Sequence, residues 1–150
     1  MSRYTGKFAT AARLLLGVIF FVFGLNGFLG FLPSPSLEGD AAVFIGGLAA
    51  APYMFPLIKG TEVLVGIALF SGRFVPLALV LLAPISVNIF LFHAVLSPGL
   101  GLPLFIVAAQ LFLAWFYRDT YRPLFHAQRV AAPADGRSRS TRVHVPAEAT

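Results

Sequence analysis

The segment from Phe55 to Gly72 sets a lysine and a glutamate inside an apolar run, which few folds can accommodate. Lys59 and Glu62 are three residues apart, so both side chains share one face if the segment is helical. A lone charge in hydrocarbon costs several kcal/mol, and such residues are usually functional or paired. The segment therefore predicts a membrane protein with a polar site in its interior.

The composition favours a membrane protein over a soluble domain. Hydrophobic residues make up 58% of the 150 residues, charged residues only 11%, and the mean hydropathy is +0.85. This length suits one domain built from a few packed spans. The absence of cysteine excludes disulfides, thiolate redox chemistry and cysteine-ligated metals. The histidines show no metal-ligand spacing, so we expect no metal site.

Four apolar segments reach the length of roughly 20 residues that a helix needs to cross a bilayer. Three breaks separate them, which read PSPS at 33–36, GR at 72–73 and SPG at 97–99. Short connections make successive helices antiparallel neighbours, so we predict an all-α, integral membrane four-helix bundle. The expected spans are residues 12–32, 53–71, 74–96 and 100–117.

The stretch from Ala41 to Ala51 is apolar but too short to cross the membrane, at about 16 Å of helix. Joined to the second span, it would give about 46 Å, too long for one crossing. Pro52 and Pro56 offer a break. We therefore predict a short outer-face helix between spans one and two, with Asp40 as its N-cap. The alternative is a kinked start to the second span.

The distribution of basic residues predicts the orientation. Ten of the eleven Lys and Arg residues fall on one side of a four-span chain, and the opposite loops carry Glu38 and Asp40 instead. We expect a multi-pass protein of the cytoplasmic (inner) membrane with both termini cytoplasmic. The net charge of +5 follows from this asymmetry and does not indicate nucleic-acid binding. Residues 1–126 form the expected membrane domain, and residues 127–150 a disordered, basic cytoplasmic tail.

Each expected span contributes a polar residue to the outer half of the membrane, whereas the inner halves are almost wholly apolar. A rise of about 1.5 Å per residue converts sequence position into depth below the outer edge. We predict a ligand-binding site from six residues: Asn26 and Lys59 at about 8 Å, Glu62, Asn88 and Gln110 at about 12 Å, and His93 at about 5 Å.

These polar residues also have structural interpretations. Lys59 can extend its ammonium to the outer headgroups, or it can pair with Glu62 or a ligand. Glu62 is too short to reach water, so it must be protonated, paired or hydrogen-bonded. Asn88 and Gln110 serve either the site or interhelical hydrogen bonding, and His93 can be a simple interfacial residue.

Small residues and one arginine are expected to set the helix packing. Arg13 is predicted to anchor the inner end of the first span. Glycines allow two helices to approach closely because they carry no side chain. This role is predicted for Gly17, Gly24, Gly27, Gly60 and Gly66.

Several short motifs, in their order and spacing, resemble the DoxX-like membrane proteins over roughly Lys7 to Phe125. They are RLLLG at 13–17, FGLNGF at 23–28, Glu62 with Gly66, GRFVP at 72–76, and APISVN at 83–88 followed by Phe92 and His93. The resemblance implies a four-span bundle. It also implies association with quinone-linked oxidation, thiosulfate oxidation or membrane-bound redox-defence complexes.

An apolar cavity with a few convergent polar groups is typical of a ligand site, and this pattern favours a redox-associated component that binds a quinone or a lipid. Glu62, Asn88 and Lys59 would hydrogen-bond the carbonyl oxygens of the ligand. No haem-ligand pair or flavin fingerprint is present, so we expect no intrinsic cofactor beyond the quinone, and partner oxidoreductase subunits as the electron source. The alternatives are a non-catalytic scaffold for such partners and a small transporter, which the apolar inner half disfavours.

Single cysteines test the orientation, because the native chain has none. We expect a thiol reagent that cannot cross the membrane to label Ser36→Cys in intact cells and to spare Ser138→Cys. The reverse labelling pattern would contradict both the orientation and the depths derived from it.

Overall fold

The computed structural model describes residues 3–33 and 36–122, which form helices and no strands. The predicted all-α class is therefore confirmed. The expected tail at 127–150 lies outside the described residues. The helices are α1 (Arg3–Leu29), α2 (Gly39–Ala50), α3 (Met54–Ser71), α4 (Val75–Val95), α5 (Gly101–Phe116) and α6 (Arg118–Tyr121).

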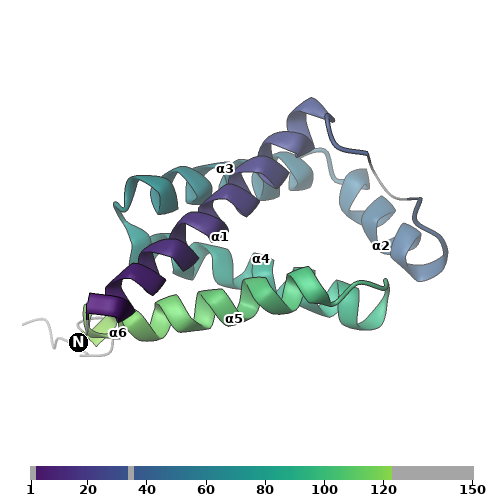
Figure 1. Cartoon of the computed structure of the whole chain (residues 1–150). Helices are drawn as coiled ribbons and strands as arrows, with labels where there is room; N and C mark the ends of the chain where they lie inside the picture. The colour runs from purple at the N-terminus through teal and green to yellow at the C-terminus, as the bar shows by residue number, and fades with distance from the viewer. Residues whose placement is uncertain (1–2, 34–35, 123–150) are drawn as a thin grey trace, which may run out of the picture.

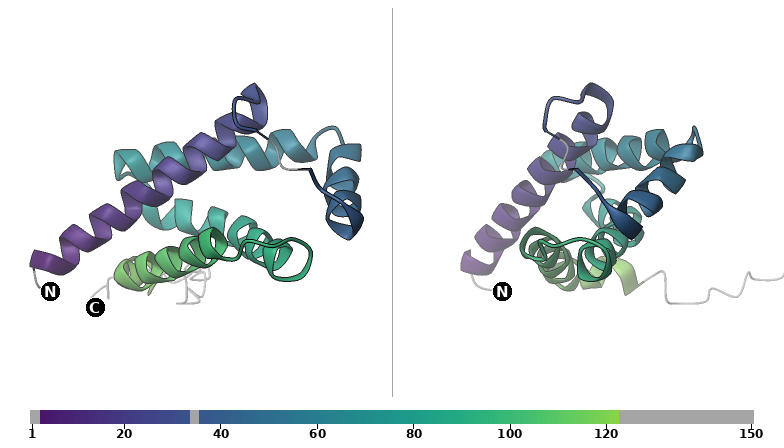
Figure 2. Two further views of the ribbon diagram at one scale, coloured as in Figure 1. Left: turned by 45° about the vertical axis from the view of Figure 1, so that its right-hand side comes forward. Right: turned by 90° about the vertical axis from the view of Figure 1, so that its right-hand side faces the viewer.

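The four long helices alternate in direction and surround a common core (Figure 1). Helix α1 packs most extensively against α3 and also contacts α5, while α4 contacts both α3 and α5. The start of α1 and the short α6 lie at one end of the bundle, and α2 lies at the other end (Figures 1 and 2). The arrangement therefore gives the bundle two chemically different ends.

The core is apolar and draws on all four long helices. One leucine from each helix is completely buried: Leu16, Leu69, Leu82 and Leu113 are 0% exposed. Many other large apolar side chains point outward, such as Leu64 on α3 and Leu111 on α5. An apolar exterior of this extent marks a surface covered by lipid. Because lipid is as apolar as leucine, packing contacts and not water exclusion hold these helices together.

Three helices are long and apolar enough to cross a membrane: Gly6–Leu29 within α1, α3 and α4. Helix α5 is equally apolar but has only 16 residues. The last three predicted spans agree with α3, α4 and α5 to within one residue at each end. That α5 crosses the bilayer as a fourth span stays a prediction.

The first helix departs from the predicted boundaries. It begins at Arg3 instead of residue 12 and continues through Lys7 and Thr10, because polar side chains are compatible with a helix that extends beyond the apolar layer. It ends at Leu29, three residues before the expected end, and Gly30 follows in the left-handed region with φ of 61°. A glycine there terminates a helix without steric cost.

The short helix between the first two long helices is confirmed as α2. A turn at residues 51–53 separates α2 from α3, so the alternative, in which this stretch is a kinked start of the second span, is wrong. The prediction that Asp40 is the N-cap is wrong. Glu38 occupies the N-cap position, and its side chain makes no capping hydrogen bond. Asp40 lies in the first turn instead, where the positive end of the helix dipole stabilises its negative charge. The position of α2 at the outer face of the membrane stays a prediction.

Glycines bring α1 and α3 into backbone contact. A Cβ atom on Gly17 would lie 3.3 Å from Leu69 Cβ, and one on Gly66 would lie 2.8 Å from the backbone nitrogen of Phe21. These close approaches confirm the predicted role of Gly17 and Gly66. The same prediction for Gly60 is wrong, because a Cβ there would meet nothing within 4 Å.

Arg13 joins α1 to the end of α3. Its Nη1 donates a 2.8 Å hydrogen bond to the carbonyl of Leu69, one of the last carbonyls of α3, which have no partner within that helix. Gly72 caps α3 with φ of 68°, and its bare Cα lies beneath the Arg13 guanidinium. A cation at a helix C-terminus is also favoured by the helix dipole. Arg13 therefore fixes the relative position of α1 and α3 at this end.

The glycines supply a matched test of the α1–α3 contact. Gly66→Ala should destabilise the protein by about 1–3 kcal/mol, because the new methyl group overlaps the backbone of Phe21. Gly60→Ala should be neutral or stabilising by up to about 1 kcal/mol, because its methyl group enters open space in the same helix. Unfolding free energies in mild detergent compare the two. Equal effects of the two substitutions would contradict this packing.

Candidate functional site

A cavity of about 360 Å³ lies between α2, α3 and α4. Its lining consists of three residues from α2, five from α3 and five from α4. Ten of the thirteen are apolar, and the three polar residues are Lys59, Glu62 and Asn88. An apolar cavity of this size with a few polar groups is typical of a small-molecule site. The structure thus brings together the three residues that the quinone hypothesis names.

The two charged residues form an ion pair. Lys59 Nζ lies 2.8 Å from Glu62 Oε2. The Glu62 side chain is 3% exposed and that of Lys59 is 21% exposed, so the carboxylate is deep and the ammonium is nearer the surface. Of the two interpretations of Lys59, pairing with Glu62 is confirmed. A charged carboxylate that is buried in an apolar medium needs a hydrogen-bonded cation close by, and Lys59 meets this need for Glu62.

The ion pair rests on the bare face of α1. A Cβ on Gly24 would lie 3.0 Å from Glu62 Cβ, and one on Gly27 would overlap the side-chain carbons of Lys59. The two glycines are three residues apart, as are Lys59 and Glu62, because two antiparallel helices in contact repeat at the same interval. The predicted close approach at these glycines is confirmed. Its consequence, a wall behind the ion pair, was not evident from the sequence.

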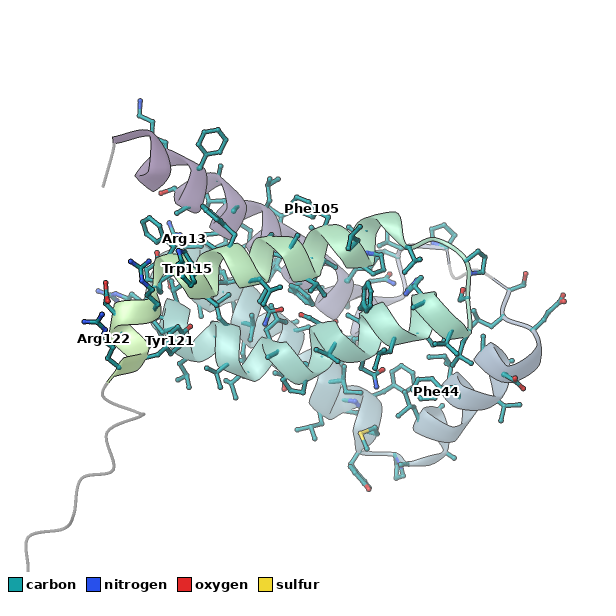
Figure 3. All side chains as sticks on the ribbon, turned by 90° about the horizontal axis from the view of Figure 1, so that it is seen from below. Arg13, Phe44, Phe105, Trp115, Tyr121 and Arg122 are labelled. Atoms are coloured by element: carbon teal, nitrogen blue, oxygen red, sulfur yellow. The ribbon has the colours of Figure 1, made fainter. Side chains whose placement is uncertain are left out.

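Helix α2 forms the third wall of the cavity. Phe44, Ile45 and Leu48 line it, and the Phe44 ring centroid lies 5.8 Å from that of Phe92 on α4. Figure 3 shows Phe44 directed from α2 towards α4. The sequence predicted the helix but not this role. The spacing of residues 44, 45 and 48, which places them on one helical face, was the available signal.

Asn88 has a free carboxamide. It lines the cavity, and its side chain makes no hydrogen bond to any residue in the ranges 3–33 and 36–122. The Asn88 side chain is exposed on the outside of the bundle at the edge of this cavity, and in the lipid that surrounds the helices an amide loses several hydrogen bonds that water would supply. Asn88 therefore presents two donors and an acceptor that the described protein groups do not use.

The other three predicted site residues do not line this cavity. Asn26 Oδ1 accepts a 2.6 Å hydrogen bond from the backbone of Leu32, which secures the turn after α1. His93 Nδ1 donates to the carbonyl of Ile89, one turn back on α4. Gln110 is 7% exposed and its Nε2 donates a 2.9 Å bond to the Leu79 carbonyl, which joins α5 to α4. These contacts are structural, and a ligand role for the three residues stays a prediction.

Within the described ranges, no group of three or more His, Asp or Glu side chains is placed to hold a metal ion.

One further buried polar group was not among the predicted residues. Ser86 is 1% exposed, and its Oγ has no hydrogen-bond partner among the described residues. It lies on the opposite side of α4 from the cavity, among residues that line a second pocket. A serine within an apolar run carries no sequence signal that distinguishes this state from ordinary helix packing.

Long apolar helices with outward-facing leucines, and an ion pair held inside them, define an integral, multi-pass membrane protein of the all-α class. A sequence model of the DoxX family matches residues 8–94, more than half of the chain, and the protein belongs to that family. The match runs from Phe8 in α1 to Ala94 in α4, includes Lys59, Glu62 and Asn88, and stops before α5. The predicted resemblance is thereby confirmed over these residues. No curated protein and no solved structure matches the chain.

The ion pair predicts a coupled effect of two substitutions. Lys59→Met should destabilise the protein by about 3–5 kcal/mol, because it leaves the Glu62 carboxylate buried without its cation. Adding Glu62→Leu should recover most of that loss, because the double variant buries no charge. Unfolding free energies in mild detergent measure both effects.

The exposed pair between Asp119 and Arg122 gives the control. Both side chains are more than half exposed, so Asp119→Asn should change stability by less than about 0.5 kcal/mol. A Lys59→Met variant as stable as the native protein would show that the buried pair contributes nothing to the fold.

Proposed function

We propose that the protein is a redox-associated membrane component that binds an isoprenoid quinone in the cavity between α2, α3 and α4. The observation that carries this proposal is that the free carboxamide of Asn88 lines the same cavity as the Lys59–Glu62 pair, and that the other residues of this lining are apolar. A ligand for such a cavity must be mostly apolar and must offer a small number of hydrogen-bonding oxygens.

A quinone headgroup meets these requirements. Its carbonyl oxygens accept hydrogen bonds, and the Asn88 amide has two N–H donors. The Lys59 ammonium has three donors, of which one serves Glu62. The aromatic rings of Phe44 and Phe92, which form part of the lining, offer flat apolar surfaces for a planar headgroup. The isoprenoid tail would extend into the surrounding hydrocarbon.

The chain's own chemistry limits what it does in a redox reaction. Reduction of a quinone to a quinol takes up two electrons and two protons. The cavity offers Glu62 and Lys59 as groups that hold or pass protons, and none of the side chains that line it is a thiol, tyrosine or tryptophan that could carry an electron. A partner oxidoreductase would therefore supply or remove the electrons, and this chain would position the quinone. Such a partner is part of the proposal.

The proposed orientation places the cavity towards the outer face of the cytoplasmic membrane. The start of α1, the α3–α4 turn and α6 lie at one end of the bundle (Figure 1). The basic residues of these segments include Arg13 in the first half of α1, Arg73, Arg118 and Arg122, and Figure 3 shows Arg13 and Arg122 towards this end. Helix α2 and the cavity that it covers lie towards the other end. Basic residues favour the cytoplasmic side, which supports cytoplasmic termini.

A transport function has less support. Leu16, Leu69, Leu82 and Leu113, all 0% exposed, fill the bundle between the cavity and the end that carries α6. A polar solute crossing this layer would lose its hydrogen bonds without replacement. A scaffold function without a ligand remains the alternative, and it predicts no specific binding in the cavity.

Binding in lipid nanodiscs tests the proposal. A short-chain benzoquinone should bind the native protein saturably, and Asn88→Leu should weaken binding by about 3- to 10-fold, the value of one lost hydrogen bond. Thr61→Val is the matched control, because the Thr61 hydroxyl bonds to the carbonyl of Leu57 in its own helix and does not line the cavity. Unsaturable uptake equal to that of empty nanodiscs would favour the scaffold function.

A further inference from the structure

A second pocket of about 270 Å³ lies between α4 and α5, on the face of α4 opposite the Lys59–Glu62 cavity. Leu79, Ala83 and Ser86 line it from α4, and Val107 and Gln110 from α5. No residue of this pocket lines the first cavity, so the two spaces are separate.

Tyr121 closes one end of the second pocket. Its hydroxyl donates a 3.1 Å hydrogen bond to the carbonyl of Pro76 at the start of α4. Figure 3 shows Tyr121 beside this end of α4. Burial raises the pKa of Tyr121, and its hydroxyl, which is protonated at neutral pH in any case, acts as the donor. Tyr121 thus has its partner within the protein and acts as the floor of the pocket.

The polar lining of this pocket is incomplete. Ser86 is 1% exposed and its hydroxyl has no partner among the described residues, although a serine in a membrane helix ordinarily bonds to a carbonyl one turn back. Gln110 uses its Nε2 on the Leu79 carbonyl, which leaves Oε1 as an acceptor. The lining of the pocket therefore includes one unpaired hydroxyl donor, whose oxygen neighbouring atoms cover until a bound molecule displaces them, and one amide acceptor.

The exposed residues around the pocket indicate the route of access. Val80 and Val87 are each 52% exposed, and Leu111 is 65% exposed, and all three line the pocket. In a membrane protein such apolar, exposed side chains face lipid. The pocket therefore opens sideways into the hydrocarbon, and its occupant must dissolve there.

We propose that the α4–α5 pocket is a second ligand site, which takes an apolar, lipid-dissolved molecule carrying a hydroxyl group, such as an alkylphenol or a long-chain alcohol. A hydroxyl group on the bound molecule matches this lining, because it can accept a hydrogen bond from the Ser86 hydroxyl and donate one to Gln110 Oε1. The proposal does not rest on the quinone function, since it uses the opposite face of α4 and different residues.

The test measures binding of labelled para-nonylphenol to the full chain in nanodiscs, with empty nanodiscs as the background. We expect one saturable site per chain. The methyl ether para-nonylanisole, which lacks the donor, should bind about 3- to 10-fold more weakly, and Ser86→Ala should weaken nonylphenol binding by a similar factor. Ala83→Leu, which fills the pocket from a more exposed position, should abolish the site.

Two controls separate binding in the α4–α5 pocket from binding in the first cavity and from a loss of folding. Asn88→Leu should leave nonylphenol binding unchanged, because Asn88 lines only the first cavity. Ser86→Ala should not lower the melting temperature without ligand, because the hydroxyl has no partner to lose. A lower melting temperature would show that water or another protein group already satisfies Ser86, and would overturn the proposal. Equal affinity for the phenol and its ether, or binding unaffected by Ser86→Ala, would also overturn it.

Discussion

The close contact between α1 and α3 is the constraint on which the rest of the structure depends. The residues in contact follow an antiparallel register, in which Gly24 faces Glu62, Gly27 faces Lys59 and Gly17 faces Leu69. Only glycine permits this approach, because any Cβ on α1 at positions 24 and 27 would occupy the space of α3. The register fixes the rotation of α3, and this rotation turns Lys59 and Glu62 towards the interior and away from lipid.

An ion pair is a costly way to stabilise an apolar bundle. Two well-packed apolar side chains often do as well or better, because no charge then has to leave water. The pair between Lys59 and Glu62 is held where it has access to a cavity instead of being sealed in the core. The buried leucine layer carries the packing, and the ion pair lies beside it. This arrangement, with apolar packing in the core and the charges at a cavity, is the one expected if the charges contribute more to ligand binding than to the stability of the fold.

Much of the architecture could be predicted from the sequence because the breaks are chemically plain. Gly72 and Pro52 stand where an apolar chain has to turn, so three helix ranges were predicted almost to the residue. The Lys59–Glu62 pair followed from spacing within one helix. The composition and the order of the motifs were enough to indicate the DoxX family, whose match includes the site but not α5.

The candidate site was harder to predict because depth is only one of two coordinates. Asn88 and Gln110 lie at similar predicted depths, yet rotation about the helix axes sends them to different pockets. Asn26 has the depth of Lys59, but it stands near the end of α1, where its side-chain oxygen accepts from the backbone N–H of Leu32, a residue outside the helix. The rotation of each helix depends on which helices it contacts. A single sequence does not specify these contacts, because leucines that face lipid and leucines that face the core have the same hydropathy.

One turn of α4 forms a wall shared by both pockets. Pro84 and Asn88 face the cavity of the ion pair, while Ala83 and Ser86 face the α4–α5 pocket. Pro84 lacks a backbone N–H, so the helix has one fewer hydrogen bond to resist a displacement at this turn. A molecule that pushes this wall from one side reduces the space on the other. If both pockets bind the ligands proposed for them, occupancy of one will change the affinity of the other, and this coupling has the same magnitude in both directions.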